Sequence, residues 1–185
     1  MFGAMIRRFL PVVTAGVFLL PACSPRNSTT KRPAMPEDAS APAPQVVKTD
    51  AEWRQQLTPE QYRILRQAGT ERAHGDVYEE FKKHPAGSYH CAGCDTLLFT
   101  TTEKFDSGCG WPSFYDPAKA DNVKLTKDYS FGGVRTEVTC AVCDGHLGHV
   151  FEGEGFDTPT DQRYCINGGA LKFVPAVRSS VGGTD

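Results

Sequence analysis

Hydrophobic and polar positions follow three different patterns along this 185-residue chain. A continuous, mostly apolar run covers residues 9–20, and it is too short to cross a bilayer as a mature helix. Residues 50–68 instead carry apolar side chains at helical spacing. Beyond residue 85, short runs of aromatic and β-branched residues alternate with Gly, Asp and Asn. This pattern predicts short helices followed by an antiparallel β domain with long loops.

Two helices are predicted before the β domain. Residues 50–57 have helical character. A second helix begins after Thr58, because this residue can cap it, Pro59 suits the first helical position and Gln61 completes a capping box. Gly69 is expected to end this helix. The clearest expected strands are residues 88–90, 97–101, 134–138, 149–152 and 171–174.

The first 48 residues are interpreted as a targeting signal followed by a tether. A short basic stretch followed by the apolar run is typical of a secretory signal, here residues 1–22. The segment Leu20-Pro21-Ala22-Cys23 resembles a bacterial lipobox, so Cys23 is expected to carry a lipid; an ordinary cleaved signal with a stray cysteine is the alternative. Ser24 favours sorting to the outer membrane. The remaining chain then divides into a disordered Pro/Ala/Ser-rich tether at 23–48, a folded domain at 49–176 and a flexible tail at 177–185.

Composition and charge exclude little. Apolar residues make up 39% and charged residues 23% of the chain, as in ordinary globular proteins. The formal net charge of −2 gives no general basic field of the kind that binds nucleic acid, so no nucleic-acid partner is expected. The unusual feature is the seven cysteines, whose grouping suggests separate roles.

Four cysteines form two CxxC pairs, Cys91 with Cys94 and Cys140 with Cys143. Each pair can make a tight turn that offers two thiolates, and two such turns give a tetrahedral zinc site. The long separation between the pairs predicts that the metal joins distant segments of one domain. Two structural disulfides or two redox-active pairs are the alternatives. Neither pair is followed by the helical pattern of thioredoxin-type redox sites.

Two further cysteines, Cys109 and Cys165, stand in glycine- and aromatic-rich surroundings. Arg163 is two residues from Cys165 and would share its face on a strand, where a cation lowers the pKa of a thiol. These two cysteines could equally form a structural disulfide, or act as small buried hydrophobes. Spacing alone does not decide between function and structure.

Two histidines, His146 and His149, lie three residues apart between glycines. They could donate protons near neutral pH, bind a metal, or simply fill the core. Two close histidines together with a free cysteine favour covalent chemistry.

The motifs in order, CxxC, SGCGWPSF, CxxC, GHLGHVF and RYCIN, resemble the methionine-R-sulfoxide reductase family over roughly residues 50–175. The stretch YRILRQAGTE is also similar to the N-terminal segment of that family. The resemblance implies a mainly β fold of two antiparallel sheets with short N-terminal helices and a structural four-cysteine zinc site. It also implies an enzyme that reduces the R epimer of peptide-bound methionine sulfoxide and so repairs oxidised proteins.

The resemblance further assigns roles to residues. Cys165 is the expected nucleophile, which becomes a sulfenic acid, and Cys109 resolves it as a disulfide. His146, His149 and Asn167 complete the catalytic set, and the expected substrate-binding residues are Trp111, Phe151 and Arg163. One Zn²⁺ is held by Cys91, Cys94, Cys140 and Cys143.

The expected partners follow from this chemistry and from the N-terminal segment. They are oxidised proteins, a thioredoxin-like dithiol that reduces the disulfide, and a membrane reached through the lipid at Cys23, on the periplasmic face of the bacterial outer membrane. Two rival functions remain: a zinc-containing binding module whose cysteines are inert, and a general thiol–disulfide oxidoreductase.

Overall fold

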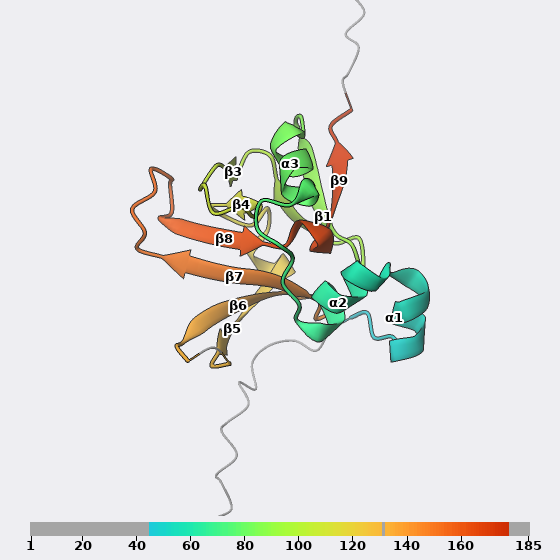
Figure 1. Ribbon diagram of the computed structural model, residues 1–185. Helices are drawn as coiled ribbons and strands as arrows, with labels where there is room; N and C mark the ends of the chain where they lie inside the picture. Colours follow the sequence, from blue (N-terminus) through green and yellow to red (C-terminus); the bar gives the residue numbers. More distant parts are fainter. Residues whose placement is uncertain (1–44, 131, 178–185) are drawn as a thin grey trace, which may run out of the picture. The chain divides into compact units, whose positions relative to one another are not determined.

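The structure, a computed structural model, describes residues 45–130 and 132–177. In that part of the chain, three α-helices precede nine strands, which form two antiparallel sheets (Figure 1). The predicted mainly β fold with two antiparallel sheets is confirmed. The predicted signal at 1–22, Cys23, most of the tether and nearly all of the tail lie outside the described residues. None of the helices in the described part is long and apolar enough to cross a membrane.

The first two helices begin where the sequence places them. Helix α1 (Asp50–Gln56) follows Thr49, and α2 (Pro59–Gln67) follows Thr58, each with a capping box. The end of α2 differs slightly from the prediction, because Ala68 and not Gly69 adopts the left-handed conformation. Gly69 has another role: a Cβ there would lie 2.8 Å from the carbonyl oxygen of Arg63, so only glycine lets the chain turn this closely.

A third helix, α3 (Asp76–Lys83), was not predicted. It is short, and its cap residue Gly75 makes no side-chain hydrogen bond, so its local signals are weak. Tertiary packing stabilises it instead, because Tyr78 and Phe81 are buried and Phe81 packs edge-on against Phe114 with ring centroids 5.6 Å apart. Such an aromatic pair contributes roughly 0.5–1.5 kcal/mol beyond its buried area.

The smaller sheet has the order β2-β1-β9 and the larger has the order β3-β4-β8-β7-β6-β5. The smaller comprises β1 (Gly87–Cys91), β2 (Leu97–Thr100) and β9 (Leu171–Pro175). The larger comprises β3 (Lys104–Phe105), β4 (Ser113–Phe114), β5 (Val123–Asp128), β6 (Arg135–Cys140), β7 (His146–Glu152) and β8 (Gln162–Ile166). Two 3₁₀ turns, η1 (Ala120–Asn122) and η2 (Gly168–Ala170), precede β5 and β9.

Buried aromatic rings join the two sheets. Phe99 of β2 stacks on Phe114 of β4 with ring centroids 4.3 Å apart, and Tyr89 of β1 meets Phe114 at 5.1 Å. All three side chains are almost completely buried. This core holds β4, and the loop before it, at a fixed position against β8, where the candidate chemistry lies.

Candidate active site and metal site

Strand register builds the first row of the site. In the larger sheet, His149 of β7 pairs with Cys165 of β8 on one side and with Glu137 of β6 on the other, and Cys165 also pairs with Ser113 of β4. Directly paired residues of neighbouring strands point to the same face of a sheet. A carboxylate, an imidazole, a thiol and a hydroxyl therefore lie in one row across four strands.

A β-bulge brings the second histidine to this face. Residues three apart on a regular strand point to opposite faces, so His146 would normally point away from His149. The register between β6 and β7 shifts at Val138 and Thr139, so that Thr139 pairs with His146 while Val138 pairs with Gly148. One extra residue in β7 restores the common face, and the two imidazole rings lie with centroids 5.6 Å apart.

Gly148 lets β7 approach β8 closely beside the thiol. A Cβ at this position would lie 2.1 Å from the carbonyl oxygen of Cys165. No larger residue fits without moving the backbone that carries Cys165.

Each histidine has its own carboxylate. Glu137 meets Nδ1 of His146 at 2.6 Å, and Asp128 meets Nε2 of His149 at 2.8 Å. The same oxygen of Asp128 also accepts a hydrogen bond from Arg135 at 2.6 Å. These contacts orient both rings. They have no local signal in the sequence, because the carboxylates come from β5 and β6.

Burial and charge shift the pKa of these groups in opposite directions. Burial lowers the pKa of His149, and the hydrogen bond to Asp128 acts against that effect. Hydrogen bonds from Ser130, and then from His149, hold the pKa of Asp128 well below its usual range. Asp128 therefore stays ionised and favours the protonated form of His149.

A cavity of about 140 Å³ opens beside Cys165. Five of the predicted site residues and three other residues line it. Its lining in the described part of the chain is Thr70, Trp111, Arg135, Gly148, His149, Phe151, Cys165 and Asn167. Cys165 and His149 thus face a common space in which an apolar surface, Trp111 and Phe151, adjoins polar groups, as expected of a small-ligand site.

The segment before α3 fixes one wall of this cavity through Glu71. Trp111 donates from its indole nitrogen to the carbonyl of Glu71 at 3.1 Å, and the amide of Glu71 donates to the side chain of Asn167 at 2.9 Å. The Glu71 carboxylate accepts the backbone amides of Gly168 and Gly169 at 2.6 and 2.8 Å. Burial raises the pKa of Glu71, while these two amides act to lower it. Trp111 and Asn167 are thereby held by one segment.

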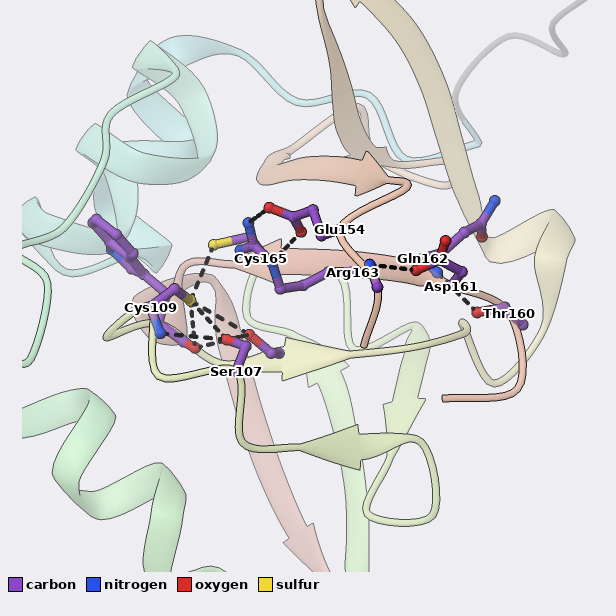
Figure 2. Close-up of polar contacts among 11 residues, drawn as sticks. Ser107, Cys109, Glu154, Thr160, Asp161, Gln162, Arg163 and Cys165 are labelled. Carbon is purple, nitrogen blue, oxygen red and sulfur yellow. Dashed lines mark hydrogen bonds and ion pairs between the residues drawn. The ribbon is translucent and has the colours of Figure 1, made fainter. Parts of the chain in front are cut away.

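Cys109 lies next to Cys165, with the two sulfur atoms 3.8 Å apart (Figure 2). Both are free thiols in the structure. Ser107 donates to the sulfur of Cys109 at 3.0 Å. The hydrogen bond from Cys165, aided by Ser107 and Ser113, lowers the pKa of Cys109 to about 4, whereas donation to Cys109 and burial raise the pKa of Cys165. These contacts thus favour ionisation of Cys109 over that of Cys165.

Arg163 lies beside the cavity and not in its described lining. It is buried, makes a two-bond ion pair with Glu154 at 2.7 and 2.8 Å (Figure 2), and stacks over the ring of Phe151 at 4.6 Å. It acts to lower the pKa of Cys165, as expected from the sequence, but the contact with Cys109 and burial outweigh it. Arg163 thus supports Phe151 from the neighbouring strand.

The four CxxC cysteines gather at a second place. Cys91 ends β1 and Cys140 ends β6, and each begins the same turn: the amide of Asp95 donates to the Cys91 carbonyl at 2.9 Å, and that of Asp144 to the Cys140 carbonyl at 2.8 Å. Both aspartates adopt positive φ, which Asp tolerates better than most residues. The two turns join the smaller sheet to the larger.

The sulfur positions fit a tetrahedral metal. All four sulfurs lie within 4.8 Å of one another, with Cys91 3.7 Å from Cys143 and Cys94 3.5 Å from Cys140. Zinc–sulfur bonds of about 2.3 Å in a tetrahedron place sulfurs about 3.8 Å apart, and a disulfide needs about 2.05 Å. The four cysteines could therefore hold one metal ion, and these two close contacts between the pairs are too long for S–S bonds.

Sequence reasoning missed several groups around the cysteines and histidines. They are Thr70, Glu71, Ser107, Ser113, Asp128, Arg135, Glu137 and Glu154. Ser107 and Ser113 lie inside the SGCGWPSF motif and could have been found there. Thr70 and Glu71 likewise end the stretch YRILRQAGTE. Asp128 and Glu137 could not be found, because only strand pairing brings them to the histidines.

Fold and site together are consistent with the class of oxidoreductases: a pair of thiols adjoins a cavity with an oriented histidine, apart from a four-cysteine cluster that could hold a metal ion. A family model described as the SelR domain matches residues 57–175. The chain belongs to this family, that of the methionine-R-sulfoxide reductases.

Curated relatives agree with this assignment. Peptide methionine sulfoxide reductase B8 of Arabidopsis thaliana is 55% identical over 130 residues, covering 70% of this chain and 87% of the relative. Peptide methionine sulfoxide reductase MsrB of Leifsonia xyli subsp. xyli is 52% identical, covering 75% and 97%. The protein of the same name from Bradyrhizobium diazoefficiens is 53% identical, covering 70% and 91%.

The predicted enzyme class, a peptide-methionine (R)-S-oxide reductase, is confirmed. Members of the family reduce methionine sulfoxide in oxidised proteins, so the oxidoreductase and repair role holds at that level.

Proposed function

We propose that this chain reduces the R epimer of peptide-bound methionine sulfoxide with Cys165 as nucleophile and Cys109 as resolving cysteine. The observation that carries the proposal is the placement of the two thiols. Cys165 lines the cavity opposite His149, and Cys109 lies 3.8 Å from it on the side of Ser107. A substrate in the cavity meets Cys165 first, and Cys109 is within reach for the following step.

In the first step, the sulfur of Cys165 attacks the sulfoxide sulfur, and the oxygen is transferred to Cys165. The products are methionine and a sulfenic acid, so the thiol and the sulfoxide supply all the atoms. The oxygen needs a proton as its bond to the methionine sulfur weakens. His149 lines the cavity and is oriented by Asp128 through Nε2, and we assign it as this acid.

His146 supports the same oxygen. It is buried and bound to Glu137 through Nδ1, and its Nε2 has no hydrogen-bond partner among the described residues. A buried polar nitrogen without a partner is costly, and a substrate oxygen would remove that cost. The indole of Trp111 and the ring of Phe151 then receive the methyl group on the positively polarised sulfur.

In the second step, Cys109 attacks the sulfur of the sulfenic acid, a Cys109–Cys165 disulfide forms and water leaves. A thioredoxin-like dithiol restores both thiols by exchange and becomes a disulfide itself. Cys109 is only partly exposed, so the dithiol must approach across the loop that carries Ser107.

The metal at the four CxxC cysteines is proposed to be one structural Zn²⁺. Four thiolates at these distances are the donor set that zinc prefers. When bound, zinc cross-links the ends of β1 and β6. The side chain of Arg66 in α2 donates to the carbonyl of Cys143 at 2.8 Å. The amide of Val46 donates to the carbonyl of Val142, in the same turn after β6, at 2.9 Å.

The location is proposed from the N-terminal pattern alone: a lipid on Cys23 and residence at the periplasmic face of the outer membrane. A full-length chain labelled with fatty acid and partitioned between detergent and water tests this. The Cys23→Ser variant should lose the label and enter the aqueous phase, and an unlabelled wild-type chain would contradict the anchor.

The central test uses a peptide that carries both sulfoxide epimers and a chemical dithiol. Wild type should consume only the R epimer, and Cys165→Ser should consume neither. Reduction of both epimers, or full activity in Cys165→Ser, would overturn the proposal.

A further inference from the structure

Two serine hydroxyls surround the sulfur of Cys109 and not that of Cys165. Ser107 donates to Cys109 at 3.0 Å (Figure 2). Ser113 lies 2.7 Å from the Ser107 oxygen and 3.5 Å from the sulfur. Ser113 is almost completely buried on β4. A hydroxyl carries one donor hydrogen. Ser107 thus donates to the sulfur, while the Ser113 hydroxyl donates to the Trp111 carbonyl at 3.2 Å and contacts the Ser107 oxygen.

We propose that Ser107 is a catalytic residue of the resolving step, stabilising the Cys109 thiolate that attacks the sulfenic acid, and that Ser113 is a positioning residue for its hydroxyl. This inference rests on the proposed function, because it assumes that Cys165 becomes a sulfenic acid.

The serines matter most after the first step. In the resting pair, the S–H of Cys165 makes the largest contribution to the low pKa of Cys109. Oxidation of Cys165 removes that S–H. The Ser107 hydroxyl still donates to the sulfur at 3.0 Å, closer than the Ser113 hydroxyl at 3.5 Å, at the moment when Cys109 must be a nucleophile, and the thiolate is the attacking form.

The step balances without an added reagent. The sulfur of Cys109 forms a bond to the sulfur of Cys165, the S–O bond breaks, and the proton that Cys109 gave up leaves with the hydroxyl as water. Cys109 is oxidised and the sulfenic sulfur is reduced.

The other charged or titratable neighbours of Cys109 come from three directions. Tyr78 faces it from α3, with a pKa raised to about 12 by burial, and the Arg163 guanidinium from β8 carries a raised pKa. Asp106, in the same loop, has a lowered pKa because it accepts the amide of Gly108. None of these shifts moves a group toward neutral pH. The His74 ring lies against Gly110, the residue after Cys109 in the sequence.

The experiment separates the two steps in a single turnover without dithiol. Wild type, Ser107→Ala, Ser107→Thr and Ser113→Ala are mixed with peptide sulfoxide and quenched at successive times across a range of pH. Methionine formation reports the first step, and loss of the second thiol reports disulfide formation. His74→Asn is measured beside them to remove the neighbouring imidazole.

In Ser107→Ala, the pH profile of disulfide formation should move to higher pH by about one unit, with methionine formation unchanged. A thiolate of higher pKa is less populated at low pH and more nucleophilic at high pH, by roughly threefold per unit. The two profiles should therefore cross, with about threefold slower closure on the acid side. Ser107→Thr keeps the hydroxyl and should follow wild type, and Ser113→Ala should shift less in the same direction.

A Ser107→Ala profile that overlays wild type, or one that falls equally at every pH, would overturn the assignment, since the second outcome indicates a structural role. A profile that moves equally in His74→Asn would assign the shift to the imidazole and also overturn it. Wild-type chain that forms no methionine would instead refute the proposed function, so the two failures are distinguishable.

Discussion

The chain contains two groups of cysteines that have similar sulfur–sulfur distances but different surroundings. The four-cysteine cluster is made of two turns with the same local geometry, and its sulfurs approach one another across the two sheets at 3.5–3.7 Å. The Cys109–Cys165 pair has almost the same spacing, 3.8 Å, but it lies beside a cavity with hydroxyls and an imidazole around it. Distance alone therefore does not separate a metal ligand from a redox thiol; the surrounding donors and access to solvent do.

The largest expected effect is the loss of sulfoxide reduction when the proposed nucleophile is replaced. Cys165→Ser should lower sulfoxide reduction by roughly a thousandfold or more, because removing a nucleophile removes the covalent route. The measurement is methionine release with dithiol present. Cys109→Ser is the matched control: without dithiol it should still release one methionine per chain, because the first step does not need Cys109. Repeated turnover of Cys165→Ser would place the nucleophile elsewhere.

Replacing a cysteine of the four-cysteine cluster should lower the stability of the domain more than it lowers the rate of reduction. Cys94→Ser removes one of four ligands and should release the metal and lower the free energy of unfolding by several kcal/mol. Metal content and the thermal midpoint measure this, and chelation of wild type should reproduce it. A metal-free chain that remains as stable as wild type would show that the cluster does not join the sheets.

A smaller effect is expected at the cavity wall. Trp111→Ala should lower kcat/KM by about a hundredfold through loss of substrate position, with a smaller loss in Trp111→Phe. Steady-state kinetics on the peptide sulfoxide would measure both. Equal activity in all three chains would leave Trp111 as a part of the packing only.

The smallest predicted change sharpens the acid assignment. Asp128 raises the pKa of His149 against the effect of burial, so Asp128→Asn should lower that pKa further. The protonated acid is then lost at lower pH as pH rises. Methionine formation should begin to fall at a pH about one unit lower, which is about a fivefold loss at the original midpoint. Ser130→Ala is the control near Asp128 that leaves the imidazole contact in place. An unchanged profile in Asp128→Asn would remove His149 from the role of acid.

The sequence by itself determined the features that depend on neighbours along the chain. Thr49 and Thr58 cap α1 and α2 because capping boxes are local, and each CxxC turn closes within a few residues. The family assignment likewise follows from the sequence, because it depends on the order of the motifs along the chain. Helix α3 escaped prediction because packing of Tyr78 and Phe81, and not a capping residue, stabilises it.

Only the tertiary structure decided which groups meet. The bulge in β7 brings His146 to the face of His149, and strand pairing delivers Glu137 and Asp128 to them. The 56 residues that separate Cys109 from Cys165 carry no sign that the pKa of Cys109 is lowered and that of Cys165 raised. The physical reason is that a pKa depends on donors, burial and charges within a few ångströms, and here those donors come from four strands and a loop that approach one another only in the folded chain.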